Sequence, residues 1–349
     1  MESSYNNYQI INPFNYKDWN KRIQKFADYS FFHSLEWAAL LKEVYDYYPK
    51  YVVSESDDEL NFILPLFEVN SRITGKRGIS LPFSDFCVPL SLEGKIPSPL
   101  ITYLEELGRK NKWTYYELRG GNINFPHINP SQVYLSHIIQ LVSSEDKVFS
   151  NFRSSTKRNI QKALRSGVKI SFHHTFESIE QFYRLNCITR KKHGLPPQPY
   201  LFFRRFYDHI ISNNNGFVIL AHYESMTIAG AIFLHIGIKG LFKYGASDPV
   251  YQNLRANNLI FWEAIRWFIK NGYNEINLGK TLPEHTGLRQ FKNGWGALEK
   301  PIHYYKFHFK KKRFVRNKER EIGFYNKIFH NLPIPILRLI GNKLYRHIG

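Results

Sequence analysis

The pattern of apolar and polar residues predicts the same order of strands, turn and helix twice along the chain. Apolar runs typical of strands surround a short turn, and an amphipathic helix and a further strand follow. In the first half these segments are residues 60–69, 70–78, 79–86, 99–113 and 114–120. In the second half they are residues 228–236, 237–240, 241–248, 257–273 and 274–280. The pattern predicts an internal repeat of one α/β unit.

Helical spacing fills the region between the two repeats. "SSTKRNIQKALRSG" begins with hydroxyl residues that can cap a helix and ends on Gly167, and residues 176–194 and 201–216 follow as two further helices. Hairpins that precede a helix and a strand suggest mixed sheets flanked by helices. We therefore expect an α/β (α+β) chain with domains at residues 1–145 and 146–310 and a basic tail at 311–349.

Charge is the strongest compositional signal. The formal net charge is +19, which favours polyanionic partners such as nucleic acid, anionic lipid or phosphorylated substrates. Residues 306–320 hold eight Lys or Arg and one Glu. Beyond them, one helical face would carry Ile336, Leu337, Ile340, Leu344 and Ile348. This basic amphipathic tail either lies on an anionic membrane surface or packs on the parent domain.

The remaining composition indicates an ordered globular protein, because 43% of the residues are hydrophobic and only 22% are charged. The amino terminus lacks the pattern of a secretory signal. Cys87 and Cys187 are typical of buried thiols in a reducing compartment, so we expect a cytoplasmic protein, with peripheral contact at the inner face of the membrane through the tail. The histidines show no zinc-site spacing, and we expect no metal and no cofactor.

Several segments resemble the FemAB-like branch of the GNAT acyltransferase superfamily. They are "FFHSLEWAALL", "LPLFEV", "LPFSDF", "FRSSTKRNIQKALRSGVKI", "YGASDPVYQNLRANNLIFWEAIRW", "NLGKT" and "GLRQFKNGWGA". The resemblance spans roughly residues 30 to 310 in the expected order and implies two tandem GNAT-like domains. FemX-like members attach amino acids from aminoacyl-tRNA to the peptide of a peptidoglycan precursor and use no metal.

The resemblance implies an aminoacyl or acyl transfer to an amine of a cell-envelope or glycan precursor, which fits an anionic phosphorylated sugar or a lipid-linked acceptor. One departure concerns the coiled-coil arm of FemA-type members. No long heptad run is present in the second half of this chain, which argues against lipid-linked peptidoglycan as the acceptor.

Two residues are implied as catalytic. Lys292 in "GLRQFKNGWG" matches a Phe-Lys pair at the active site of FemX-like proteins, where a cation would stabilise the oxyanion or the leaving ribose oxygen. Tyr244 lies on the strand end that faces the acyl-transfer cleft in GNAT folds, where it would relay a proton or bind the acyl carbonyl. A surface lysine and a core tyrosine are the alternatives.

Other candidates would bind substrate. Lys157, Arg158 and Asn159 are expected to begin a helix, where backbone N–H groups, the helix dipole and cations favour phosphate, although they could instead be the solvated face of an amphipathic helix. Arg289 beside Lys292 is a further phosphate ligand. Asp248 would face the cleft, although Asp-Pro sequences also simply close turns. Asp85 is the corresponding acid of the first half.

The junction at residues 248–258 bears on the donor. Acetyl-CoA-using GNAT proteins have a glycine-rich loop here that wraps the pyrophosphate. In this chain Arg255 keeps a cation, but Ala256, Asn257 and Asn258 stand where glycines are needed, and either asparagine could cap the helix itself. This favours aminoacyl-tRNA over acyl-CoA as the donor. An acyl-CoA-dependent N-acyltransferase and a non-catalytic RNA-binding protein are the alternatives.

Overall fold

The computed structural model describes residues 8–57, 59–94, 96, 99–120, 125, 128–316 and 322–349. The chain forms two compact units. Unit 1 comprises Met1–Tyr134, Pro301–Arg320 and Tyr345–Gly349, and unit 2 comprises Leu135–Lys300 and Glu321–Leu344. The first division lies ahead of the predicted boundary at residue 145, because β9 (Gln132–Gln140) pairs with the unit 2 strand β14 (Glu275–Thr281).

Unit 1 contains two groups of paired strands. One sheet has the order β1-β3-β4-β7, and in the other group the order is β15-β8-β6-β5-β2, with β16 pairing β15. The strands are β1 (Gln9–Ile11), β2 (Tyr48–Pro49), β3 (Tyr51–Ser56), β4 (Glu59–Leu64), β5 (Phe67–Ser71), β6 (Gly75–Ile79), β7 (Leu90–Ser91), β8 (Tyr115–Arg119), β15 (Leu298–His308) and β16 (Arg313–Phe314). The helices are α1 (Trp19–Ile23), α2 (Leu35–Tyr45) and α3 (Leu100–Lys110).

The core of unit 1 includes the apolar face of the predicted helix. Leu100, Leu104 and Leu107 of α3 are buried, and they belong to one hydrophobic cluster with Trp113 and Tyr116. The predicted strand at residues 60–69 is interrupted, because Pro65 and Leu66 separate β4 from β5. A proline has no N–H group for a central ladder, and the chain passes here from one sheet to the other.

Unit 2 is a mixed sheet flanked by helices. Its strand order is β10-β11-β12-β13-β14-β9. The strands not yet named are β10 (Lys169–His173), β11 (Gly216–Tyr223), β12 (Met226–Ile236) and β13 (Lys239–Ser247). The helices are α4 (Glu145–Ser150), α5 (Ser154–Arg165), α6 (Phe176–Lys192), α7 (Tyr200–Phe206), α8 (Ala256–Lys270), α9 (Thr286–Asn293), α10 (Ile322–Asn331) and α11 (Ile334–Leu344).

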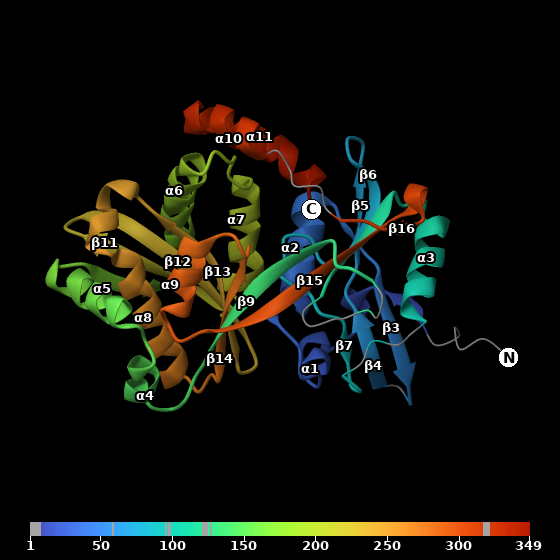
Figure 1. The fold of residues 1–349 in the computed structure, drawn as a ribbon, viewed down its shortest axis with the longest axis horizontal. Coiled ribbons are helices and arrows are strands. Elements are labelled where there is room, and N and C mark those ends of the chain that lie inside the picture. Colours follow the sequence, from blue (N-terminus) through green and yellow to red (C-terminus); the bar gives the residue numbers. More distant parts are fainter. Residues whose placement is uncertain are drawn as a thin grey trace. The chain divides into compact units, whose positions relative to one another are not determined.

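Helices cover both faces of the unit 2 sheet (Figure 1). Phe233 of β12 contacts Phe261 and Phe268 of α8 on one face. On the other face Tyr244, the register partner of Ile232, contacts rings of α6 and α7. Because neighbouring strand residues point to opposite faces, these contacts place α8 and α6 on opposite sides.

The order of the predicted repeat is present in both units, but the predicted bounds of its hairpin in unit 1 are wrong. The hairpin strands β5 and β6 lie within Phe67–Ile79, and residues 80–86, which were predicted as part of a strand, form none. In unit 1, β5 and β6 form an antiparallel hairpin, α3 follows, and β8 returns parallel to β6. In unit 2, β12 and β13 form the hairpin, α8 follows, and β14 returns parallel to β13. In each half a helix therefore connects a hairpin to a strand that runs parallel to the second strand of that hairpin.

The C-terminal tail is divided between the two units. Within unit 2, α11 packs on α6: Leu337 is fully buried and the guanidinium of Arg338 lies over the ring of Tyr183. Within unit 1, the turn at Tyr345–His347 buries Tyr345. Packing on the protein thus uses the inner part of the predicted apolar face, whereas Ile336 and Ile348 stay exposed. Residues 317–321, which include the end of the basic run, lie outside the described residues.

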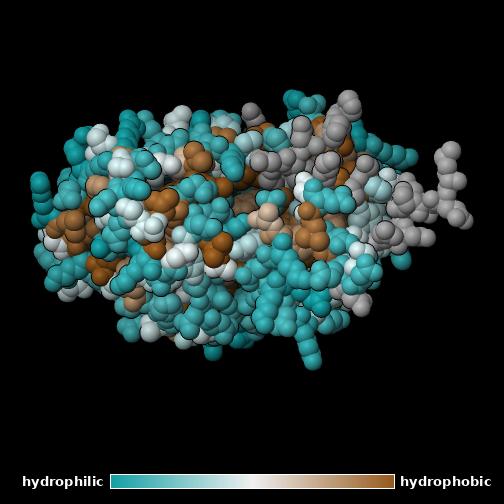
Figure 2. Space-filling model, turned by 90° about the horizontal axis from the view of Figure 1, so that it is seen from below, coloured by the Kyte–Doolittle hydropathy of each residue, from teal (hydrophilic) through white to brown (hydrophobic). Residues whose placement is uncertain are grey.

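The surface is mainly hydrophilic. Hydrophilic residues predominate on the face drawn in Figure 2, and hydrophobic ones form patches between them. Across the described part of the chain, no helix combines the length and the apolar character that a membrane span requires.

Replacing Gly341 by alanine tests how α11 docks. A Cβ atom at this position would lie 2.0 Å from the backbone oxygen of Pro197, so α11 must move. We expect faster amide hydrogen exchange in residues 334–344 and a loss of about 1–3 kcal/mol of packing energy, the usual cost of overpacking. The control is Gly287→Ala in α9, where an added Cβ meets nothing within 4 Å. Unchanged exchange in the Gly341 variant would show that α11 does not pack as described.

Candidate functional site

An interruption in β14 shapes the candidate site. Strands β13 and β14 run parallel and pair from Lys239–Leu241 to Glu275–Asn277. On its other edge, the register of β14 with β9 shifts between Asn277 and Lys280. Gly279 lies inside this bulge with φ +73°, a left-handed conformation that glycine adopts without strain. Its N–H donates to the side-chain oxygen of Asn277 at 2.8 Å, which fixes the bulge.

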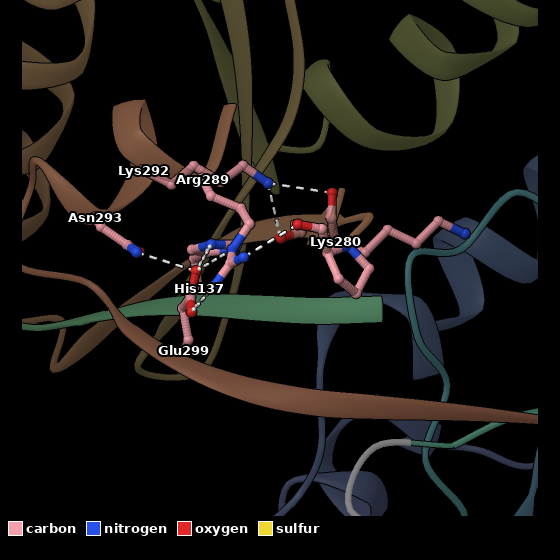
Figure 3. Close-up of polar contacts among 8 residues, drawn as sticks. His137, Lys280, Arg289, Lys292, Asn293 and Glu299 are labelled. Carbon is pink, nitrogen blue, oxygen red and sulfur yellow. Dashed lines mark hydrogen bonds and ion pairs between the residues drawn. The ribbon is translucent and has the colours of Figure 1, made fainter. Parts of the chain in front are cut away.

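Lys292 of α9 reaches this bulge. Its Nζ donates to the carbonyl oxygen of Gly279 at 2.9 Å and to that of Lys280 at 3.2 Å. Only 4% of Lys292 is exposed, so it is not one of the solvated surface lysines. Figure 3 shows the side chain extending to both carbonyls, whereas the side chain of Lys280 points away. The bulge and the lysine thus bring a cation and turned backbone groups together.

An ion pair borders the lysine (Figure 3). Arg289 binds Glu299 with two parallel hydrogen bonds of 3.0 Å and also donates to the carbonyl of Pro283. Asn293 donates to the same carboxylate at 3.0 Å. His137, on β9 opposite the bulge, places its Nε2 3.1 Å from Glu299. The carboxylate therefore ties β9, α9 and the start of β15 together.

Two titratable groups in this cluster, Glu299 and His137, have shifted pKa values. The hydrogen bond from Arg289 and those from Asn293 and His137 lower the pKa of Glu299 to about 2. Burial and the nearby Lys292 charge lower the pKa of His137. A neutral His137 that donates Nε2–H to Glu299 has its lone pair on Nδ1, an assignment that follows from the hydrogen-bond network.

Two buried polar atoms at the bulge are unsatisfied within the described residues. His137 Nδ1 and Thr281 Oγ1 are buried and have no hydrogen-bond partner there. Buried polar atoms in folded proteins are nearly always hydrogen-bonded to protein or water. His137 Nδ1 and Thr281 Oγ1 are thus polar atoms of this strand region that the described residues leave without a hydrogen bond.

Sequence reasoning identified Lys292 but missed its partners. His137 stands alone in the strand "SHIIQ", and Gly279 is one glycine among many. Glu299 offered a signal, because it is an isolated acid in the basic segment "QFKNGWGALEK". Arg289 was predicted to bind phosphate, but its guanidinium already forms a bidentate pair with this carboxylate. That geometry does not favour a phosphate role for Arg289.

Tyr244 lies in an aromatic cluster on the face of β13 covered by α6 and α7. Its ring lies 5.7 Å from Phe203 and 6.0 Å from Phe206, and the Lys243 ammonium lies 5.2 Å from its centroid. The strand end beyond it is fixed by Thr189, whose hydroxyl bonds both the N–H and the carbonyl of Ser247. The ring is half-buried, which fits both a core tyrosine and a cleft residue.

Lys157, Arg158 and Asn159 do not stand at the helix start. Helix α5 begins at Ser154 with Arg153 as its N-cap, and no side chain caps it, whereas Gly167 ends the helix with φ +79° as predicted. The Lys157 ammonium donates to the carbonyl of Ser150 and lies over the Phe149 ring, while Arg158 is exposed. The start of α5 instead borders a cavity of about 270 Å³, lined by Arg153, Thr286, Arg289, Gln290, Asn293 and Gly294.

The junction between β13 and α8 differs from the sequence expectation. Asp248 accepts a hydrogen bond from the N–H of Val250 at 3.0 Å, as a residue that closes a turn. Neither Asn257 nor Asn258 caps α8: the amide of Asn257 contacts Ser247, and Asn258 is buried. The N-cap is Arg255, with φ 59° and no side-chain cap. The backbone keeps the left-handed turn that glycine would adopt, and the Arg255 side chain is exposed.

The sequence of unit 2 matches a known domain. Residues 150–293 match the model of the acetyltransferase (GNAT) domain. This segment includes α5, the β12–β13 hairpin, α8, the bulge and Lys292. No curated protein sequence matches the chain.

Solved structures share the fold over most of the chain. FemX is 13% identical, with a TM-score of 0.64 over 86% of this chain and 97% of FemX. L-PGS from Bacillus licheniformis is 12% identical, with a TM-score of 0.51 over 87% of this chain and 96% of that protein. A tandem GNAT protein from the clavulanic acid biosynthesis pathway is 9% identical, with a TM-score of 0.51 over 75% of this chain and 83% of that protein. Residues 150–293 thus match an acetyltransferase (GNAT) domain, and these structures share the predicted tandem fold.

The protonation of His137 gives a pH dependence of stability. Its lowered pKa means that the unfolded chain binds a proton more readily than the folded one below about pH 6.5. This contribution to stability is complete above that pH and is lost as the pH falls toward the lowered pKa. We expect urea unfolding at about pH 7.5 and 5.5 to show a smaller loss of stability for His137→Gln than for the wild type. Equal losses would show that His137 titrates as in the unfolded chain.

Proposed function

We propose that this acyltransferase, which carries a GNAT domain at residues 150–293 within a FemX-like fold, transfers an aminoacyl group to an amine of an anionic cell-envelope or glycan precursor. The observation that carries the proposal is the buried Lys292 ammonium at the bulge of β14, beside unsatisfied polar atoms. Such a fixed cation in a poorly solvated place is suited to stabilising negative charge that develops during a reaction.

The reaction needs few groups from the protein. The acceptor amine attacks the acyl carbonyl carbon, and a tetrahedral intermediate with a negatively charged oxygen forms. When it collapses, the C–N bond remains and the C–O bond to the tRNA ribose breaks. The amine proton passes to the departing ribose oxygen, so no covalent enzyme intermediate and no metal are required. In this proposal Lys292 stabilises the oxyanion, and alignment of the two substrates supplies much of the remaining acceleration.

Tyr244 has the second role in this proposal. It lies on β13 past the point where the pairing of β13 with β14 ends at Leu241 and Asn277. A donor whose acyl group enters where the two parallel strands part would have the bulge on one side and the Tyr244 strand on the other. We assign the Tyr244 hydroxyl to hydrogen-bonding the acyl carbonyl or relaying the proton.

The donor has two candidates, and each rests on a different observation. The overall fold is most like FemX among the structures compared above, which supports aminoacyl-tRNA. The uncapped start of α8 and the left-handed turn at Arg255 support an acyl-CoA donor, because free helix N–H groups bind phosphate. Side chains at Arg255 and Asn257 still restrict how closely a pyrophosphate approaches, so we keep aminoacyl-tRNA as the first candidate.

The proposed location in the cell rests on the net charge of the protein. A formal net charge of +19 suits a cytoplasmic enzyme that handles tRNA or phosphorylated precursors. Exposed Ile336 and Leu339 on α11 support peripheral membrane contact as part of the proposal.

Lys292→Met removes the ammonium and keeps most of the side-chain volume. We expect transfer at saturating donor to fall about 100- to 1,000-fold, the usual effect of losing one oxyanion-stabilising group. Stability should fall by about 1–3 kcal/mol for each carbonyl left without a donor, so the assay is run well below the melting temperature. Lys280→Met is the matched control, because its backbone carbonyl takes part in the site while its side chain points away. Equal rates in both variants would remove Lys292 from the chemistry.

Donor identity is tested by offering the enzyme two labelled donors. A radioactive amino acid charged on tRNA and labelled acetyl-CoA are each incubated with the protein and a cell-wall precursor extract. We expect label transfer from aminoacyl-tRNA. Transfer from acetyl-CoA alone would show that the donor is an acyl-CoA and not aminoacyl-tRNA. Arg255→Ala should then raise the KM for acetyl-CoA.

A further inference from the structure

Unit 1 contains a cavity apart from the Lys292 site. Its volume is about 600 Å³, within the range of small-molecule pockets. The lining comes from the end of α2, the β5–β6 hairpin and the C-terminal segment. The lining residues are Tyr45, Asp46, Asn70, Arg72, Ile73, Arg346 and His347.

Side chains of unit 1 hold the C-terminal segment in place. The Tyr47 hydroxyl donates to the carbonyls of Tyr345 and Arg346, each at 3.2 Å. The carbonyl of His347 accepts from Thr74 at 2.8 Å and from the Arg77 guanidinium at 2.7 Å. These bonds fix the backbone on both sides of Arg346, so this arginine is positioned beside the cavity rather than carried on a loose end.

The cavity is electropositive. Arg72 and Arg346 are exposed, and within the described residues neither forms an ion pair. Behind them, Arg77 is only 1% exposed, and its guanidinium bonds neutral oxygens rather than a carboxylate. A buried cation bonded to neutral groups keeps its field, which is weakly screened in the protein interior. Asp46 is the one acid among the lining residues.

We propose that this cavity binds the phosphate of a small phosphorylated molecule, with Arg72 and Arg346 as its ligands. Guanidinium groups on two separate segments can each donate two hydrogen bonds to phosphate oxygens, and two such groups match the charge of a phosphate dianion or a diphosphate better than a single carboxylate. Asn70 adds a neutral donor, and Asp46 accepts from a hydroxyl or amino group of the same molecule. This site does not depend on acyl transfer, because it is defined by binding alone.

Calorimetric titration of the full-length protein with inorganic pyrophosphate tests the site. We expect Arg72→Gln and Arg346→Gln each to weaken binding roughly 10- to 100-fold, the effect of removing one charged hydrogen-bonding partner. Arg109→Gln is the control, because it removes the same charge from an exposed arginine of α3 that pairs with Glu105. Equal weakening in all three variants would reduce the effect to general charge and overturn the proposal.

A second arm distinguishes a soluble ligand from a lipid headgroup. Uridine diphosphate is titrated as the soluble probe, and vesicles of phosphatidylglycerol in phosphatidylcholine are used for sedimentation. Binding of either probe that is lost in Arg72→Gln and Arg346→Gln, but kept in Arg109→Gln, supports the phosphate site and identifies the source. Absence of binding by pyrophosphate, uridine diphosphate and vesicles overturns it. These results do not depend on Lys292, so failure here leaves the transfer proposal to its own test.

Discussion

A lysine ammonium held inside the protein by backbone carbonyls is the constraint on which the candidate site depends. Lys292 can be buried because the bulge at Gly279 turns two carbonyl oxygens toward it, at 2.9 and 3.2 Å. The bulge in turn requires a residue with φ +73°, and it shifts the register so that His137 faces it from β9. The ion pair of Arg289 with Glu299 then fixes α9, which carries the lysine. Fold and charge are thus coupled: the strand interruption stabilises the cation, and the cation stabilises the interruption.

The repeat explains why the site lies where it does. Each unit returns a strand parallel to the second strand of a hairpin after one helix, but the bulge and the lysine described here belong to unit 2. In unit 2, β13 and β14 pair briefly before β14 continues along β9. Unit 1 offers a cavity with arginines instead, built partly by the last residues of the chain. The two units have one topology and carry different chemistry.

Periodicity predicted the order of elements in the repeat, the amphipathic α3 and the long α8, because these depend on local spacing of apolar residues, but it misplaced the hairpin of unit 1. It did not predict the site partners, since His137, Gly279 and Glu299 meet only through strand register and a bulge. Arg289 shows the same limit: its charge is legible in the sequence, but its carboxylate partner ten residues later is fixed by the fold. The asparagines at 257 and 258 had the right chemistry for a cap, and the helix begins instead at a left-handed arginine. Tail packing likewise depended on Gly341 fitting against Pro197, which no hydrophobic pattern records.

The Lys292 ammonium is proposed to stabilise the oxyanion of an acyl transfer. A crystal structure with a non-hydrolysable aminoacyl-adenosine that carries a tetrahedral phosphonate in place of the reacting carbonyl tests it most directly. We expect a phosphonate oxygen about 2.7–3.1 Å from Lys292 Nζ, the distance of an oxyanion donor. The opposite result is a complex in which the phosphonate lies away from β14 and makes no contact with Lys292 Nζ, which keeps its bonds to the carbonyls of Gly279 and Lys280.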